Sequence, residues 1–200
     1  MHETRRSGIN LRENSMNVKQ HKRRTTERRS LLTEPSLYID ILEKMPIFKG
    51  LSVNQFTRIL SICSQQTLSE NDIICVEGEE SHQMFILLKG VLKIMFSDGK
   101  ELTRILPLGL VGEMGIFTGD RRSASVVAGS DSIVLSIHKT ELFRLFRNDS
   151  DLGIHVLTNV IHEMTHKLKK NNIIIEELRH ICAPGEYTMI VAKSLSESVD

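Results

Sequence analysis

The sequence is poor in cysteine and has no apolar run long enough to cross a bilayer. Its three cysteines, Cys63, Cys75 and Cys182, are odd in number and lie in or beside apolar segments. This pattern argues against a disulfide framework and favours reduced thiols. Residues 1–30 lack the apolar core of a secretory signal peptide. These absences predict a cytoplasmic protein without a transmembrane segment.

The overall composition is that of a globular protein, but the charge is unevenly distributed. Of 200 residues, 40% are apolar and 26% are charged, which suits one domain with extensions. Residues 1–30 contain nine Lys or Arg and three Asp or Glu, a net charge of +6, whereas the remainder has a net charge of −5. We therefore expect residues 1–33 to be a basic disordered arm, either solvated or in contact with nucleic acid, anionic lipid or an acidic partner. The Pro-, Gly- and Ser-containing residues 183–200 are expected to be a loose tail.

Two short helices are predicted where the arm ends. Pro35 is well placed to begin the first helix, and Ser52 can cap the second. The predicted inward-facing residues are Leu37, Ile41 and Leu42 in the first helix, and Phe56, Ile59, Leu60 and Cys63 in the second.

Six short strands are predicted after Gln66, separated by glycine-containing turns such as Asp98-Gly99. Their ranges are Asp72–Val76, Met84–Leu88, Val91–Phe96, Leu102–Leu106, Ser125–Ala128 and Ser132–Ile137. Many short strands with such turns indicate a β-roll or jelly-roll barrel. The predicted fold class is therefore α+β, with the barrel and its flanking helices in residues 34–148.

A long helix is predicted over residues 149–182, after a short amphipathic helix at Lys139–Arg147. Its apolar residues recur at alternating spacings of three and four, which is the pattern of a coiled-coil seam. The seam consists of Ile154, Leu157, Ile161, Met164, Leu168, Asn171, Ile175 and Leu178. This pattern predicts a parallel homodimer in which Asn171 fixes the register; the alternative is a helix that packs its seam on its own barrel.

The stretch from Val111 to Ala124 contains the residues best suited to binding a ligand. Gly112 and Gly115 bracket Glu113 and Met114, so the backbone can approach a ligand closely and expose N–H groups to an anion. Arg122 offers a planar, positively charged fork for a phosphate. Glu113 is an acceptor suited to a sugar hydroxyl. Together these groups predict a small phosphorylated sugar ligand; the alternative is a surface hairpin with solvated arginines.

This stretch resembles the phosphate-binding cassette of cyclic nucleotide-binding domains, a family that includes the catabolite activator protein and regulatory subunits of cAMP-dependent protein kinase. The similarity extends to Met84–Val91 and, more weakly, from Leu37 to Leu178. The resemblance implies that Glu113 binds the ribose 2′-hydroxyl and that Arg122 and Ser123 hold the cyclic phosphate together with the turn N–H groups. The ligand-binding residues so implied are Gly112, Glu113, Met114, Gly115, Arg122, Ser123 and Ala124.

The resemblance implies a sensor that signals to an effector protein by a ligand-dependent shift of the long helix, and not an enzyme. We expect cAMP as the ligand, with cGMP or a cyclic dinucleotide as alternatives. The family's base-contacting pair would fall on Lys167 and Leu168, which do not match, so adenine contacts cannot be transferred. Since only about twenty residues follow the helix, no helix-turn-helix DNA binding is expected. The alternative function is a nucleic-acid-binding dimer that uses the basic arm, with a ligand-free barrel.

One further motif resembles a metal site. His162, Glu163 and His166 match the H-E-x-x-H pattern of zinc peptidases, with both imidazoles on one helix face. A third ligand on the same continuing helix could not fold back onto the metal. We therefore expect no metal site, and a metallopeptidase is the less favoured alternative.

Overall fold

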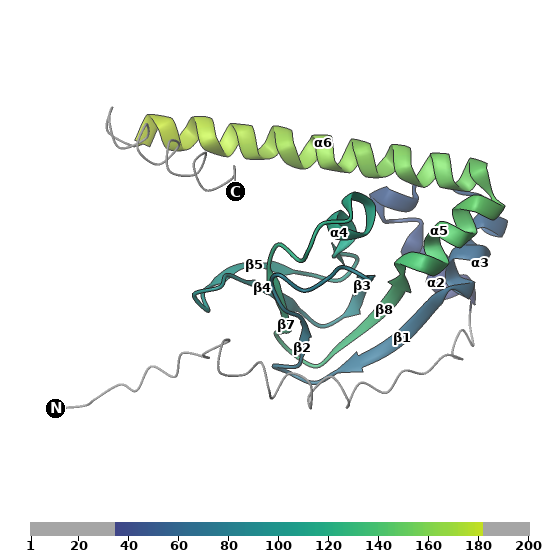
Figure 1. Ribbon diagram of the computed structural model, residues 1–200, viewed down its shortest axis with the longest axis horizontal. Helices are drawn as coiled ribbons and strands as arrows, with labels where there is room; N and C mark the ends of the chain where they lie inside the picture. Colours follow the sequence, from purple (N-terminus) through teal and green to yellow (C-terminus); the bar gives the residue numbers. More distant parts are fainter. Residues whose placement is uncertain (1–34, 182–200) are drawn as a thin grey trace. The chain divides into compact units, whose positions relative to one another are not determined.

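Two four-stranded antiparallel sheets form the centre of the protein in a computed structural model that describes residues 35–181 (Figure 1). The strand order is β1-β8-β3-β6 in one sheet and β2-β7-β4-β5 in the other. The strands are β1 (Cys63–Leu68), β2 (Ile73–Cys75), β3 (Gln83–Lys89), β4 (Leu92–Met95), β5 (Glu101–Ile105), β6 (Leu110–Val111), β7 (Ser125–Ala128) and β8 (Ser132–His138). This arrangement, with its flanking helices and a long C-terminal helix, confirms the predicted β-roll of class α+β.

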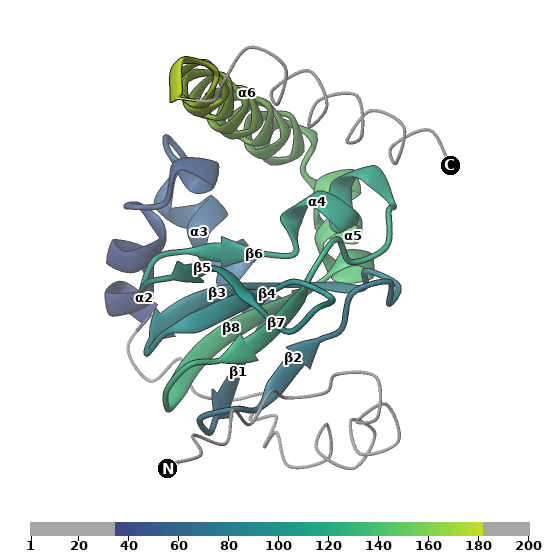
Figure 2. The ribbon, with the colours of Figure 1, turned by 90° about the vertical axis from the view of Figure 1, so that its left-hand side faces the viewer.

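The two sheets face each other across an apolar core (Figure 2). Phe85, Leu87 and Val134 come from the first sheet, and Leu92 and Val126 come from the second. Alternate side chains of a strand point to the same face, so each strand contributes its apolar residues to this interior. Burial of these side chains is the main source of stability for the roll.

All six predicted strands are confirmed, with ends that agree within one residue. Two strands were missed. β1 has the polar sequence Cys-Ser-Gln-Gln-Thr-Leu, and its pairing with β8 is supported by polar side chains, since Gln66 Nε2 donates to Ser136 Oγ at 3.1 Å. β6 has only two residues and gives no periodic signal. The assignment of Cys63 to the inward face of a helix is wrong, because Cys63 begins β1.

Three short helices begin where the sequence predicts, namely α2 (Pro35–Leu42), α3 (Val53–Ser61) and α5 (Lys139–Asn148). The described chain also contains the 3₁₀ helix η2 (Pro46–Phe48), which the sequence does not predict, and α4 (Glu113–Thr118), which begins two residues before the predicted turn. Ser52 caps α3 in a capping box, in which its Oγ accepts from Gln55 N–H while the Gln55 side chain accepts from Ser52 N–H. Phe56, Ile59 and Leu60 of α3 are buried, as predicted.

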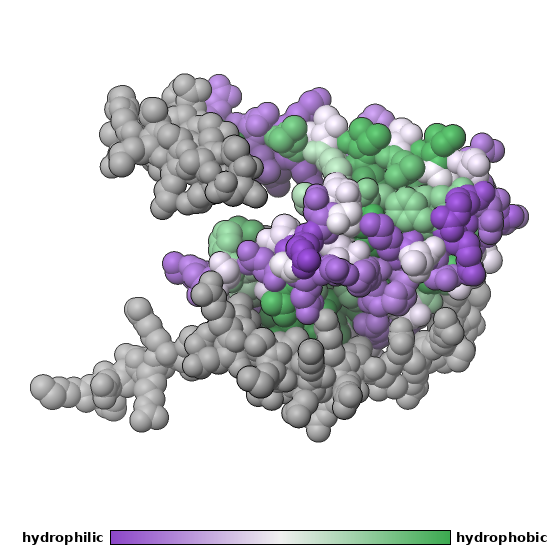
Figure 3. All heavy atoms as spheres, viewed as in Figure 1, coloured by the Kyte–Doolittle hydropathy of each residue, from purple (hydrophilic) through white to green (hydrophobic). Residues whose placement is uncertain are grey.

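The helix α6 runs from Ser150 to Ile181. The chain divides into two units at His155 and Val156, within this helix. In the first unit, Leu152 N–H donates to Asp149 Oδ1 at 3.0 Å, and His155 Nε2 lies 3.0 Å from Lys49 O, so both fix the helix start. Three seam side chains, Ile154, Ile161 and Leu168, are exposed by 65%, 65% and 62%. Figure 3 shows apolar side chains on the surface of this helix.

Several predictions concern parts of the chain that the structure leaves undescribed. The basic arm, the tail at 183–200 and Cys182 lie outside residues 35–181, and the domain boundaries stay predictions. Burial raises the pKa of the Cys63 thiol to about 12. Within residues 35–181, no helix has the length and apolar character needed to cross a membrane.

Gly90 and Gly78 allow a stability test of the roll. Both glycines have a positive φ, +94° at Gly90 and +79° at Gly78. A Cβ added at Gly90 would lie 2.6 Å from Asp131 O, whereas a Cβ added at Gly78 would have no neighbouring atom within 4 Å. We expect Gly78→Ala to lower the free energy of unfolding by about 1–2 kcal/mol, through backbone strain alone. Gly90→Ala should cost about 3 kcal/mol or more in urea unfolding, because a backbone clash is added. Equal losses would contradict this packing.

Candidate functional site

The predicted ligand-binding stretch folds as a tight turn, one short helix and a second turn. Gly112 is the N-cap of α4 with φ +82°, and Gly119 is its C-cap with φ +88°. L-amino acids with a side chain rarely adopt this left-handed conformation, so glycine is required at both positions. Gly119 N–H donates to Gly115 O at 3.1 Å and ends the helix. The predicted helical turn around Gly115–Phe117 is therefore confirmed as part of α4.

Arg122 is held beneath this turn by backbone groups and an aromatic ring. Its side chain is only 9% exposed. Nη1 donates to Gly112 O at 3.4 Å, Nη2 donates to Gln83 O, and the guanidinium lies 5.9 Å from the centre of the Phe85 ring. The backbone is fixed as well, because Arg122 N–H donates to Glu79 O at 2.8 Å. The guanidinium is thus fixed in place before any ligand arrives.

One donor of the Arg122 guanidinium is unsatisfied. Its buried Nε has no hydrogen-bond partner in the described part of the chain. A buried cation with an unsatisfied donor is costly, since transfer of a charge out of water is unfavourable unless it is paired. An anion that reaches this guanidinium would therefore be bound strongly.

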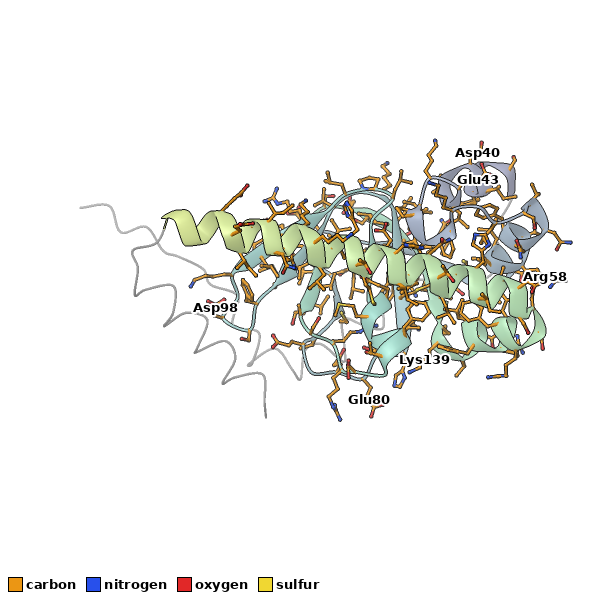
Figure 4. The ribbon with its side chains drawn as sticks, turned by 90° about the horizontal axis from the view of Figure 1, so that it is seen from above. Asp40, Glu43, Arg58, Glu80, Asp98 and Lys139 are labelled. Atoms are coloured by element: carbon orange, nitrogen blue, oxygen red, sulfur yellow. The ribbon has the colours of Figure 1, made fainter. Side chains whose placement is uncertain are left out.

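Arg122 also lines a cavity of about 360 Å³ between β1, β2, β3 and the loop after β2. The cavity is lined by both polar and apolar residues. Its polar lining residues are Gln66, Glu79, Glu80, His82, Gln83 and Arg122, and its other lining residues are Leu68, Ile73, Ile74, Cys75 and Phe85. Figure 4 labels Glu80, which belongs to this loop, and Lys139, the first residue of α5. Lys139 N–H donates to His82 O at 2.8 Å, which fixes the loop against α5.

The other predicted ligand-binding residues lie around α4 and not in the cavity lining. Gly112 directly contacts the guanidinium, since a Cβ there would lie 2.0 Å from Arg122 Nη1. Glu113 is half-buried in the first turn of α4, and Met114 is 53% exposed. Ser123 is exposed and Ala124 is half-buried. The structure therefore brings Gly112 and Arg122 together, but it does not place the Glu113 carboxylate in the cavity that Arg122 lines.

Three residues of the site were missed by the sequence analysis. Gln83 contributes a backbone carbonyl, which has no signature in the sequence. Phe85 supports the guanidinium with its ring, and it belongs to the stretch Met84–Val91, whose resemblance could have pointed to it. Ser81 packs against Gly115, where a Cβ would lie only 2.1 Å from its Oγ. The close approach of these two residues explains why glycine stands at position 115.

The residues of the H-E-x-x-H motif lie on α6, far along the sequence from the stretch Val111–Ala124. His162 and His166 are exposed and Glu163 is half-exposed. In the described part of the chain, His, Cys, Asp and Glu side chains form no group of three that could hold a metal ion.

Comparison with known proteins supports the predicted resemblance. Residues 65–149 match the family model described as "Cyclic nucleotide-binding domain". This part of the chain is therefore similar to cyclic nucleotide-binding domains. It contains both α4 and Arg122, so the predicted resemblance of the stretch to the family's cassette lies inside the matched residues.

The chain is similar to parts of larger proteins. The chain is 29% identical to a cyclic nucleotide-gated channel of Caenorhabditis elegans over 174 residues, which cover 82% of the chain and 22% of the channel. It is 28% identical to a cAMP-dependent protein kinase regulatory subunit of Colletotrichum orbiculare over 117 residues, 58% of the chain and 30% of that subunit. The chain thus spans less than a third of the length of these curated relatives.

A solved structure with the same fold is a cyclic nucleotide-binding domain from Methylobacillus flagellatus. Its TM-score is 0.59 at 21% sequence identity, and the match covers 66% of the chain and 76% of that structure. At this identity the similarity supports the β-roll fold.

Proposed function

We propose that the protein is a regulatory cyclic nucleotide sensor whose ligand is a 3′,5′-cyclic nucleotide bound at α4 and Arg122. The observation that carries this proposal is the buried guanidinium beneath a glycine-rich turn, whose Nε has no hydrogen-bond partner in the described chain. A cyclic phosphodiester carries one negative charge and two exocyclic oxygens, which suit the planar donor fork of arginine. Because this chemistry involves binding and no reacting group, the proposed role is regulation and not catalysis.

The remaining cassette residues receive roles by their resemblance to the family. Glu113 accepts a hydrogen bond from the ribose 2′-hydroxyl, and Ser123 and the N–H groups of the turn contact the phosphate. Glu113 is half-buried at the start of α4, so a modest side-chain movement would let it meet a sugar above the turn. Gly112, Met114, Gly115 and Ala124 shape the backbone around the ligand.

The proposed ligand is cAMP, with cGMP as the first alternative. The similar kinase subunit is named for cAMP, which supports this choice. The family's base-contacting positions, which fall on Lys167 and Leu168, do not match. The base is therefore the least constrained part of the ligand, and both nucleotides belong in the first binding experiment.

A chain of aromatic contacts links the cassette to the start of α6. Phe117 of α4 lies 6.3 Å from Phe143 of α5, and Phe143 lies 5.8 Å from Phe146, measured between ring centres. Phe146 in turn packs on Gly153, where a Cβ would lie 3.0 Å from Phe146 Cβ. A ligand that pulls α4 toward Arg122 would displace Phe117 and hence bias the start of α6, to the extent that it binds the two states with different affinity.

The long helix is the proposed dimerisation and output element. Its seam presents Ile154, Ile161 and Leu168 at the surface of the single chain. Self-association of two such helices would bury these side chains and offer an effector protein a ligand-dependent surface.

Arg122→Leu tests ligand binding, with Arg121→Leu as a matched control. Arg121 is the exposed neighbour, and its Nη1 donates to Gly78 O at 2.8 Å. Arg122→Leu should weaken cAMP binding roughly 30- to 1000-fold in titration calorimetry, since a buried charge-assisted contact is lost. Arg121→Leu should change the affinity less than threefold. The proposal fails if the unaltered protein gives no heat with cAMP or cGMP.

Leu168→Glu tests the dimer, with Ile173→Glu as its control. Leu168 lies in the seam and Ile173 lies outside it, although their exposures are similar, 62% and 57%. A charge in the seam should raise the dimer dissociation constant at least tenfold in sedimentation equilibrium, because it would be buried without a partner. Ile173→Glu should leave the dimer intact. A monomer at all concentrations of the unaltered protein would contradict the proposal.

A further inference from the structure

Five polar or charged side chains of the described chain are buried, and two of them have an unsatisfied atom. Ser125 Oγ accepts from Glu77 N–H at 3.0 Å, Ser132 Oγ donates to Ser130 O at 2.8 Å, and Ser136 Oγ donates to Ser64 O at 3.2 Å. The two exceptions are Arg122 Nε and Ser81 Oγ. Ser81 is only 7% exposed. Buried polar groups are almost always paired in folded proteins, so both exceptions call for an explanation.

Both unsatisfied groups lie against the same short segment. Ser81 Oγ would lie 2.1 Å from a Cβ at Gly115, and Arg122 Nη1 would lie 2.0 Å from a Cβ at Gly112. Both glycines stand at the start of α4, Gly112 as its N-cap and Gly115 in its first turn. Each glycine therefore leaves room for one polar side chain, and the two side chains converge on the turn that begins α4.

Ser81 reaches this place from a different part of the chain. It lies in the loop between β2 and β3, some thirty residues before the cassette, and it is not part of the motif that resembles the family. The loop is held rigidly, because Arg122 N–H donates to Glu79 O and Lys139 N–H donates to His82 O, both at 2.8 Å. Ser81 is therefore fixed between two anchored residues.

We infer that Ser81 is an additional ligand-binding residue, whose hydroxyl donates a hydrogen bond to an exocyclic phosphate oxygen of the bound nucleotide. This inference rests on the proposed function. One anion would satisfy both unpaired groups: Arg122 supplies the positive charge, and Ser81 supplies a neutral donor from the neighbouring loop. In the unliganded protein the Ser81 hydroxyl destabilises the fold, because it is buried without a hydrogen-bond partner.

Ser81→Ala has two opposite expected effects. The unliganded protein should melt at a higher temperature, since a buried, unpaired hydroxyl is removed. The dissociation constant for cAMP should rise roughly tenfold to hundredfold, since a hydrogen bond to a charged phosphate is lost. Ser132→Ala is the matched control: it removes a buried serine hydroxyl that has a partner, so it should lower the melting temperature and leave the affinity unchanged.

Phosphorothioate analogues of cAMP test the contact between the Ser81 hydroxyl and the phosphate directly. The Rp and Sp forms of cAMP each replace one exocyclic oxygen with sulfur, a poorer acceptor. If Ser81 contacts one of these oxygens, the ratio of Rp to Sp affinities should change at least threefold between the unaltered protein and Ser81→Ala. An unchanged ratio would overturn the inference, because a merely structural serine would weaken both forms alike.

The two proposals fail in different ways. If the unaltered protein binds cAMP or cGMP and Ser81→Ala binds it equally well, the role of Ser81 is wrong while the sensor stands. If the unaltered protein binds neither nucleotide, both proposals are overturned.

Discussion

The position of one guanidinium determines the architecture of the site. Arg122 is buried, its Nη groups donate to two backbone carbonyls, its guanidinium lies over an aromatic ring, and its Nε has no hydrogen-bond partner in the described chain. A protein tolerates a buried charge with an unsatisfied donor only if the rest of the fold outweighs its cost, and the apolar core between the two sheets does so here. We propose that this guanidinium is kept in place to bind an anion.

The surrounding sequence is constrained by the space that this side chain occupies. Gly112 must be glycine for two reasons, its positive φ and its contact with the guanidinium. Gly115 has an ordinary φ, and its lack of a side chain is explained by Ser81 Oγ and by Asp120 O, which lie 2.1 Å and 2.7 Å from the place of a Cβ. The cassette thus depends on the loop before β3 as much as on its own residues, and the two segments form one unit across a long sequence separation.

The sequence predicts the fold to the extent that local signals are strong. Alternating apolar residues and glycine turns locate six strands, and the Ser52 capping box locates α3. The sequence does not predict β1, because the pairing of this strand is supported by polar contacts such as that of Gln66 with Ser136. It does not predict β6 either, because a strand of two residues is too short to show a period. Of the site, the sequence indicates Arg122 and the glycines. It cannot indicate Gln83, whose contribution is a carbonyl, or Ser81, whose importance arises only from packing.

The most direct test of the account is a crystal structure of the protein with cAMP. The account predicts a phosphate oxygen within about 2.7–3.2 Å of the Arg122 guanidinium and the ribose 2′-hydroxyl within the same range of the Glu113 carboxylate. Because Glu113 does not line the same cavity as Arg122 in the present structure, this second contact is the more demanding. A nucleotide bound away from Arg122, or a Glu113 carboxylate that points away from the sugar, would contradict the account.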